Sequence, residues 1–383
     1  MRRPSHPGAL LAATAMVLLL LVPAAAASAH PTAPLAPGGG RGDLGAAFTM
    51  SNAVSGNVVF AYGVGPGGTL VPAGNYSTGG TGTGASLADS GSLALTADHA
   101  FLLVVNAGDS SVSVFAVHAP GSRGPALTLV DRVGSGGIEP VSVTVHGSLV
   151  YVLNAGSATT PGNIAGFYLS GWGALFPIPR SSEPLSTSAP AGPAQISFNP
   201  EGNVLVVTEE DTNVIDTYTV NFWGVAAAPT VNPSNGTTPY GFDFTPQGTL
   251  VVSDASIGAL SSYSVARNGA LNVVSGSVPD GQAAPCWVAI SGTYAFTSNA
   301  HGSTISAYSI GARGTLSLVD AVAATTGAAD TDLAISGAHG QYLLVYDAGA
   351  GEIQAFGIGL GGSLTSLDQV AGLPPTAEGL AAF

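Results

Sequence analysis

The sequence contains no lysine, and its eight basic residues are all arginine. Against them stand 22 acidic residues, which give a formal net charge of −14 at pH 7. A surface with this excess of negative charge repels nucleic acid and anionic lipid. We therefore expect neither as a partner.

Cysteine and charge are also scarce. The single cysteine, Cys286, cannot form an internal disulfide, so stability must come from packing. Only 8% of residues are charged, whereas 46% are hydrophobic and 54 are glycine. No stretch after the first 30 residues keeps a 3.6-residue apolar period, so we expect almost no helix. The composition indicates a large core built from strands.

A unit of roughly fifty residues recurs seven times, which is the length of a β-propeller blade. Each copy brings an apolar run to a polar residue and then to a glycine-containing loop, as in residues 103–108 and 151–156. We call this polar residue the anchor. The predicted anchors are Asn52, Asn106, Asn154, Thr208, Asp254, Asn299 and Asp347.

Each unit also repeats internally. The second unit predicts four strands over residues 93–95, 101–105, 112–117 and 127–133, separated by residues typical of turns. A four-stranded sheet with two apolar faces must stack against copies of itself, and a closed ring leaves no face exposed. The fold class is therefore all-β, a seven-bladed β-propeller.

The two ends of the repeat region complement each other. Residues 379–383 resemble a first strand with no second strand after it, and residues 48–52 resemble a second strand with no first strand before it. We expect the C-terminal strand to pair into the N-terminal blade and close the ring.

The first residues have the features of an export signal. Arg2 and Arg3 precede an apolar stretch over residues 9–22, and Ala27-Ser28-Ala29 fits a cleavage site. We expect a signal peptide over residues 1–29, a Pro/Gly-rich linker over 30–45, the propeller over 46–383, and secretion to the exterior or the periplasm. The apolar stretch is too short for a membrane span, and no second candidate follows.

Several segments carry a family resemblance: residues 286–290 with 297–300, 206–209, and 106–108 with 112–115. They resemble secreted members of the lactonase-like seven-bladed β-propellers, a family that includes propeller-type 6-phosphogluconolactonases and 3-carboxymuconate cyclases. The resemblance covers about residues 46–383. It implies hydrolysis or isomerisation of a small lactone or cyclic acid in the central cleft, and a place in carbohydrate metabolism.

Strand order sorts the charged residues between the two faces of a propeller. Loops after second strands share one face with the links between blades, and this face holds Glu209, His301 and, in a long irregular segment, Arg180. We expect Glu209 to act as general base, with His301 or Arg180 holding an anionic group. The residues assigned to the opposite face are His99, His146, His339, Arg123, Arg267 and Arg313.

The segments that lead into the blades are rich in carboxylates. Glu139, Asp332 and Glu378 are candidate ligands for Ca²⁺ or Mg²⁺ in the central channel, because hard oxygen ligands suit these ions. Asp89 and Asp330 lie in the same kind of segment. The alternative is that all of them are solvated residues that cap strand ends. We expect no other cofactor.

Two classes of function remain open. As an enzyme, the chain would bind a small-molecule substrate; as a non-catalytic module, it would present its loops to an extracellular protein or glycan. Trp172, Trp223 and Trp287 fit either view, because they can stack on a sugar or fill the space between blades. A propeller is complete as a single chain, so we expect a monomer.

Overall fold

The part of the chain that the structure describes contains 29 strands and three short 3₁₀ helices, joined by turns and loops. This computed structural model describes residues 45–383, apart from residues 88, 122–123, 187–190 and 328. The predicted signal peptide and all of the predicted linker except Gly45 lie outside these residues. No described helix has the length and apolar character needed to cross a membrane.

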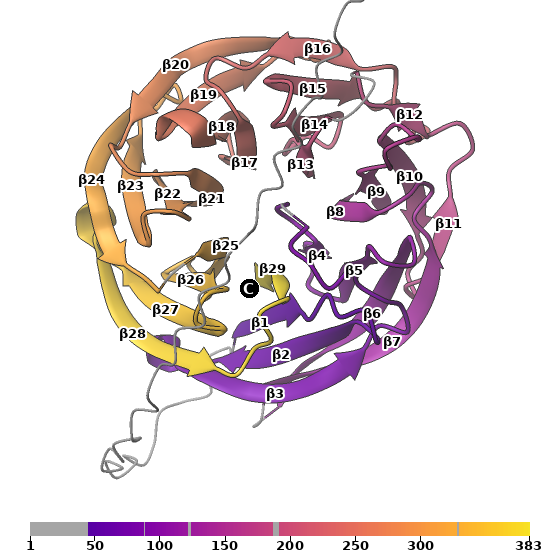
Figure 1. Ribbon diagram of the computed structural model, residues 1–383, viewed down its shortest axis with the longest axis horizontal. Coiled ribbons are helices and arrows are strands. Elements are labelled where there is room, and N and C mark those ends of the chain that lie inside the picture. Colours follow the sequence, from indigo (N-terminus) through magenta and orange to yellow (C-terminus); the bar gives the residue numbers. More distant parts are fainter. Residues whose placement is uncertain (1–44, 88, 122–123, 187–190, 328) are drawn as a thin grey trace, which may run out of the picture. The chain divides into compact units, whose positions relative to one another are not determined.

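The strands form seven sheets, or blades, arranged around an axis (Figure 1). From the innermost strand outward, blade 1 contains β29 (Glu378–Ala382), β1 (Gly45–Met50), β2 (Val58–Val64) and β3 (Leu70–Ser77). Blade 2 contains β4 (Leu93–Leu95), β5 (Phe101–Asn106), β6 (Ser111–Gly121) and β7 (Gly124–Gly134). Blade 3 contains β8 (Pro140–His146), β9 (Leu149–Asn154) and β10 (Asn163–Leu169), with β11 (Leu175–Pro177) and β12 (Glu183–Pro184) both paired to β10.

The remaining blades keep the same order. Blade 4 contains β13 (Pro193–Phe198), β14 (Val204–Glu209), β15 (Val214–Thr219) and β16 (Thr230–Pro233). Blade 5 contains β17 (Pro239–Phe244), β18 (Thr249–Asp254), β19 (Ala259–Val265) and β20 (Leu271–Pro279). Blade 6 contains β21 (Pro285–Ser291), β22 (Tyr294–Asn299), β23 (Thr304–Ile310) and β24 (Leu316–Thr325). Blade 7 contains β25 (Asp330–Ser336), β26 (Tyr342–Asp347), β27 (Glu352–Ile358) and β28 (Leu364–Ala371).

The predicted closure is confirmed. β29 is the innermost strand of blade 1 and runs antiparallel to β1, with Ala381 opposite Phe48 (Figure 1). The backbones of Phe383 and Ala46 exchange two hydrogen bonds of 3.0 and 3.1 Å. The first and last strands of the ring are thus held in one sheet.

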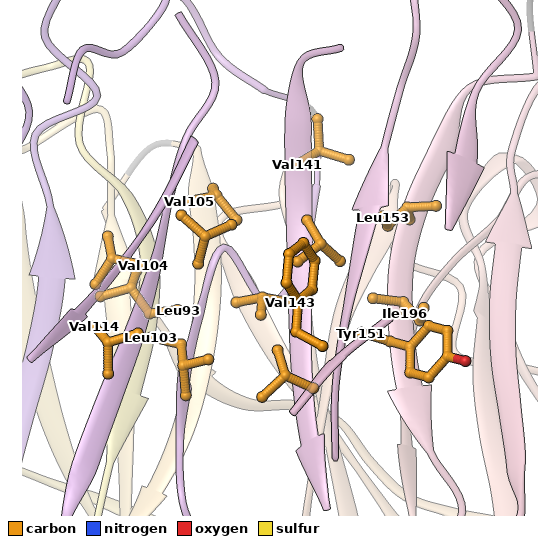
Figure 2. Close-up of a cluster of buried hydrophobic side chains, with 14 of the residues drawn as sticks. Leu93, Leu103, Val104, Val105, Val114, Val141, Val143, Tyr151, Leu153 and Ile196 are labelled. Atoms are coloured by element: carbon orange, nitrogen blue, oxygen red, sulfur yellow. The ribbon is translucent and has the colours of Figure 1, made fainter. Parts of the chain in front are cut away.

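A buried aromatic residue on the third strand of every blade fills the space between neighbouring blades. The strict repetition of this position explains why the blades pack alike, since a large side chain there occupies the wedge between sheets. Figure 2 shows part of this core, where apolar side chains from blades 2, 3 and 4 meet. The aromatic residues are Tyr62, Phe115, Phe167, Tyr218, Tyr263, Tyr308 and Phe356.

Five of the seven predicted anchors are confirmed as fully buried residues at the end of the second strand; Asn52 is also fully buried but lies two residues beyond β1, and the prediction in blade 4 is wrong by one residue. In blade 6 the anchor Asn299 pairs with Thr304 across the hairpin. The equivalent pair in blade 4 joins Glu209 to Val214, so Glu209 rather than Thr208 is the anchor. The apolar pattern alone could not separate two adjacent buried residues.

The anchors tie the hairpins together through buried hydrogen bonds. Asn106 donates from Nδ2 to Ser111 Oγ at 3.1 Å and to Ser113 Oγ at 2.8 Å. Its Oδ1 accepts a 3.1 Å hydrogen bond from Asn57 of the neighbouring blade. This side chain therefore joins two blades.

We expect Asn106→Ala to lower the free energy of unfolding by about 2 kcal/mol, because it leaves buried polar partners without hydrogen bonds. Urea denaturation measures the change. The control is Asn272→Ala, which removes an exposed amide from β20 and should change stability by less than about 0.5 kcal/mol. Equal midpoints for the two variants would contradict the role of the anchor.

The links between blades and the loops after second strands share one face, as the sequence predicted. Ala155 and Ala348, in two such loops, donate backbone hydrogen bonds to Glu139 and Ala329 in the adjoining links, at 2.8 and 3.1 Å. We call this side the loop face and the opposite side the far face. The far face carries His99, His146, His339, Arg267 and Arg313, whereas Arg123 lies outside the described residues.

Candidate carboxyl site at the centre of the ring

The innermost strands surround a central channel. Residues of β29, β4, β13, β17, β21 and β25 line a cavity of about 410 Å³ along the axis. Each innermost strand begins at the loop face, because the link before it lies there. The first residues of these strands therefore surround the loop-face end of the channel, which we call its mouth. Most residues that line the cavity, such as Ile290 and Ala382, belong to the later parts of the strands, toward the far face.

A backbone conformation that recurs in four blades shapes this mouth. Four innermost strands begin with proline opposite the anchor, and the register then shifts by a bulge. The residue before each proline is in the left-handed region, with φ of +56° at Glu139 and +57° at Thr238. Bulges beside a functional site commonly redirect side chains. Here Tyr240 and Cys286 lie within two of the bulges.

Three buried carboxyl groups meet near the mouth, and we call Asp89, Asp332 and Glu378 the axial carboxyls. Asp332 Oδ2 accepts a 2.9 Å hydrogen bond from the backbone N–H of Gly379. Glu378 Oε1 accepts one of 3.1 Å from the N–H of Leu87. Both carboxyl oxygens of Asp89 are buried and accept no hydrogen bond from another described residue.

Burial and mutual repulsion hold protons on these groups. Burial raises the pKa of Glu378 to about 7. Burial, followed by the charge of Glu378, raises the pKa of Asp332 well above its usual range. Burial raises the pKa of Asp89 in the same way, with further contributions from the charges of Glu378 and Asp332. The axial carboxyls therefore favour their neutral, hydrogen-donating forms.

Two aromatic residues pack beside this cluster. The indole Nε1 of Trp287 donates a 2.9 Å hydrogen bond to the backbone oxygen of Asp89, which fixes the link between blades 1 and 2. The Tyr240 ring packs edge-on against Trp287 with 5.3 Å between ring centroids. Burial raises the pKa of the Tyr240 phenol, and charges on Cys286, Asp89, Glu210 and Glu378 raise it further. Tyr240 thus lies within electrostatic range of Glu210 and of two axial carboxyls, Asp89 and Glu378.

Among the carboxyl groups that raise the pKa of Tyr240, Glu210 is the one that is both half-buried and located on a loop. It follows β14, and burial, with a smaller contribution from Asp211, raises its pKa to about 7. Burial and then the charge of Glu210 raise the pKa of Cys286 to about 12, so its thiol stays protonated at neutral pH. A carboxylate that titrates near neutral pH is suited to general base catalysis, whereas this thiol is not a nucleophile.

The structure does not bring the three predicted catalytic residues together. Glu209 is fully buried as the anchor of blade 4, where its Oε2 accepts a 2.9 Å hydrogen bond from Thr212. His301 is exposed and lines a separate cavity of about 590 Å³ with Ser256 and Gln282. Arg180 is exposed between β11 and β12, the outermost strands of blade 3, and so lies on the outer wall of the ring (Figure 1).

The predicted metal ligands do not form a set. Within the described ranges, no group of three or more His, Cys, Asp or Glu side chains could hold a metal ion. Glu139 occupies the left-handed position before Pro140 and belongs to the recurring backbone conformation that precedes the bulge. The structure instead brings Asp332 and Glu378 together with Asp89, and their raised pKa values disfavour the charged forms that Ca²⁺ or Mg²⁺ requires.

No described arginine serves the axial carboxyls. Arg132 forms the one ion pair among the described residues, with Asp109 at 2.9 Å. Arg267 and Arg313 lie on the far face, and Arg180 lies on the outer wall. All four described arginines therefore lie away from the channel mouth.

Comparisons with known proteins agree with this architecture. Residues 252–377 match the model of the family described as lactonase, 7-bladed beta-propeller. No curated protein sequence matches the chain.

Among solved structures, a protein from Bacteroides fragilis assigned as a 6-phosphogluconolactonase is 19% identical, with 90% of this chain and 99% of that chain covered and a TM-score of 0.70. One from Bacteroides uniformis with the same assignment is 20% identical, with 88% and 98% covered and a TM-score of 0.70. The periplasmic gluconolactonase of Pseudomonas aeruginosa is 17% identical, with 88% and 99% covered and a TM-score of 0.69. At these identities the likeness shows the fold. Together with the family match it confirms the resemblance seen in the sequence: the chain is a seven-bladed β-propeller, and its residues 252–377 match the lactonase propeller family.

Proposed function

We propose that the protein hydrolyses an uncharged lactone at the loop-face mouth of the central channel. The observation that supports this most is that the charges of Glu210, Asp89 and Glu378 all raise the pKa of the buried Tyr240, which packs against Trp287 beside the link that holds Asp89. A base that titrates near pH 7 and nearby acids are the two groups that ester hydrolysis requires. The arginines that the structure describes lie elsewhere, which favours a neutral sugar lactone over its phosphate ester.

In this proposal Glu210 takes a proton from water as the water oxygen adds to the lactone carbonyl carbon. The tetrahedral intermediate then collapses, and the bond between the carbonyl carbon and the ring oxygen breaks. An axial carboxyl donates a proton to the departing ring oxygen, so the product is a hydroxy acid. Glu210 releases its proton to solvent, the axial carboxyl takes up a proton from solvent, and the hydroxy acid loses its own proton. The product's carboxylate is then repelled by the acidic mouth, which favours release.

We also propose that the reaction takes place outside the cytoplasm. The support is the sequence of residues 1–29, with its arginine pair, apolar stretch and small-residue cleavage pattern. One of the structural relatives named above is itself described as periplasmic. Fractionation of cells that express the full chain, with detection of the shortened protein outside the inner membrane, tests this location.

Glu210→Gln should lower kcat on δ-gluconolactone by about 100-fold or more, because the amide cannot accept the proton of water. In the unchanged protein kcat/KM should rise as pH increases through about 7, since the base acts in its deprotonated form. This rise should vanish in the variant. Initial rates corrected for spontaneous hydrolysis give both results.

Glu209→Gln provides the matched comparison, because it makes the same change one residue earlier at the buried anchor. It should lower stability more than it lowers kcat. If Glu209→Gln lowers kcat and Glu210→Gln keeps full activity, the general base is Glu209, as the sequence predicted, and not Glu210. Equal activity of both variants and the unchanged protein on neutral and phosphorylated lactones would remove the catalytic proposal.

A further inference from the structure

Two neighbouring blades carry exposed tryptophans at the same position of the same turn. Trp172 lies in the turn after the third strand of blade 3, and Trp223 in the equivalent turn of blade 4. Their exposed fractions are 72% and 70%. Filling of the space between blades is therefore the wrong interpretation for these two residues, whereas Trp287 is buried beside Asp89 and Tyr240.

The turns that hold Trp172 and Trp223 are equivalent because they have the same backbone hydrogen bond. Ser170 N–H bonds to the oxygen of Ala174 at 2.9 Å, and Asn221 N–H bonds to that of Val225 at 3.0 Å. Each tryptophan is the third residue of its turn. Six turns of this kind lie in the described residues, and the third position of the other four is held by Gly67, Asn268, Arg313 and Gly361.

Aromatic side chains connect the two turns into one surface. The hydroxyl of Tyr168, on β10, donates a 2.7 Å hydrogen bond to the backbone oxygen of Trp223 and so spans the junction between the blades. Phe176 lies opposite Tyr168 in the sheet, and paired residues project from the same face. Phe222, 92% exposed, packs edge-on against Trp223. We call these five residues, Tyr168, Trp172, Phe176, Phe222 and Trp223, the aromatic platform.

The platform is held rigidly from below. Gly173 and Gly224 follow the tryptophans with φ of +90° and +70°. A side chain at Gly224 would come within 2.5 Å of Leu149 in blade 3, so the turn sits directly on the neighbouring blade. Rigid aromatic residues bind with little loss of conformational freedom.

We propose that the aromatic platform binds an uncharged polysaccharide, with sugar rings stacked on the two indoles. Apart from the aromatic residues, the two turns contain only serine, glycine, asparagine, alanine and valine, so the turns themselves carry no charge. The net charge of −14 opposes both anionic lipid and a second copy of the chain. A flat, amphipathic, uncharged surface with hydrogen-bonding neighbours suits the alternating polar edges and apolar faces of a neutral glycan.

The site is separate from the channel mouth. Trp172 and Trp223 belong to turns on the far face, whereas Glu210 and the axial carboxyls lie at the loop face. Binding to a polysaccharide would hold the protein at a carbohydrate-rich surface without covering the proposed catalytic groups. This inference therefore stands or falls independently of lactone hydrolysis.

The test uses the full chain with insoluble cellulose, insoluble xylan and soluble hydroxyethylcellulose as probes. We expect retention on at least one probe, quenching or a blue shift of tryptophan fluorescence on titration, and binding about tenfold weaker for Trp172→Ala and for Trp223→Ala. Hydrolysis of δ-gluconolactone should be unchanged in both variants, because neither residue touches the channel.

Leu360→Ser is the matched control. Leu360 is 99% exposed in the equivalent turn of blade 7, so its replacement removes an exposed apolar side chain from the same structural setting. It should leave polysaccharide binding unchanged. Failure of the unchanged protein to bind any probe, or equal binding by the double variant Trp172→Ala/Trp223→Ala, would overturn the proposal. Tryptophan-dependent binding to phosphatidylcholine vesicles, or tryptophan-dependent dimers in light scattering, without glycan binding would assign the platform to a membrane or to a second copy instead.

Discussion

Removal of residues 378–383 should abolish cooperative unfolding or lower Tm by about 7 °C or more, the largest effect on stability that we expect from any single change. The deletion takes away the whole of β29 and leaves β1 as an open edge, although every residue of β1 is buried in the intact ring. Loss of the buried Leu380 and of the backbone pairing should cost on the order of 5 kcal/mol. Thermal unfolding followed by circular dichroism measures it.

A peptide of residues 376–383 added to the truncated protein should restore part of the lost Tm, because the vacant position in blade 1 would accept it. Leu360→Ser serves as the control, since an exposed residue outside the closure should leave Tm nearly unchanged. If the truncated chain unfolded with the midpoint and slope of the full chain, closure by β29 would not be a source of stability.

Stability should fall as pH rises from about 5 to about 8, because of the axial carboxyls. Burial raises the pKa of Glu378 from its ordinary value of 4.5 to about 7, so between these values the folded protein holds a proton that the unfolded chain has lost. Stability rises with pH only where the unfolded state binds more protons, and here the opposite holds. The contribution of Glu378 is therefore fully present below pH 4.5 and is lost as pH rises through about 7. Asp332 and Asp89, whose pKa values are raised further, extend the same trend to higher pH.

Glu378→Gln should accordingly stabilise the protein at pH 8 by roughly 2 to 3 kcal/mol and flatten the slope between pH 5 and 8. The amide keeps an oxygen that can accept the hydrogen bond from Leu87 but cannot become charged. Urea denaturation at a series of pH values gives the free energies.

Asp98→Asn is the control, because the pKa of Asp98 is shifted in the opposite direction to that of Glu378. Hydrogen bonds from the Thr96 hydroxyl and the Ala100 N–H lower the pKa of Asp98, so its contribution to stability is lost as pH falls. That substitution should leave the slope between pH 5 and 8 unchanged. A slope of the same size in Glu378→Gln as in the unchanged protein, or one that Asp98→Asn removes, would exclude Glu378 as a source of it.

The architecture could be predicted because the signals that specify it are local. Turn residues recur at fixed intervals, and the strands predicted in the second unit correspond to β4, β5, β6 and β7. Closure could be inferred as well, because residues 379–383 and residues 48–52 each lack the partner that the other supplies. Both arguments require only the order of elements along the chain.

The candidate site was less accessible to prediction, for reasons of register and distance. Glu209 and Glu210 are adjacent in sequence, yet strand pairing buries the first at the anchor and leaves the second half-exposed beside Cys286. Arg180 was assigned to the cleft because its segment is irregular, but pairing of β11 and β12 to β10 places it on the outer wall. No composition rule distinguishes these outcomes.

By itself the sequence determined the number of blades, the strand order within each blade, the face on which each loop lies and the closure by the last strand. These follow from periodicity, because a repeated apolar unit has few ways to bury both faces of its sheet. Only the tertiary structure decided which carboxyl groups share a site and which tryptophans face solvent. The N–H of Leu87 and the carboxyl of Glu378 are 291 positions apart in the chain and become neighbours through ring closure. The electrostatics of such a contact depend on distances that no local pattern encodes.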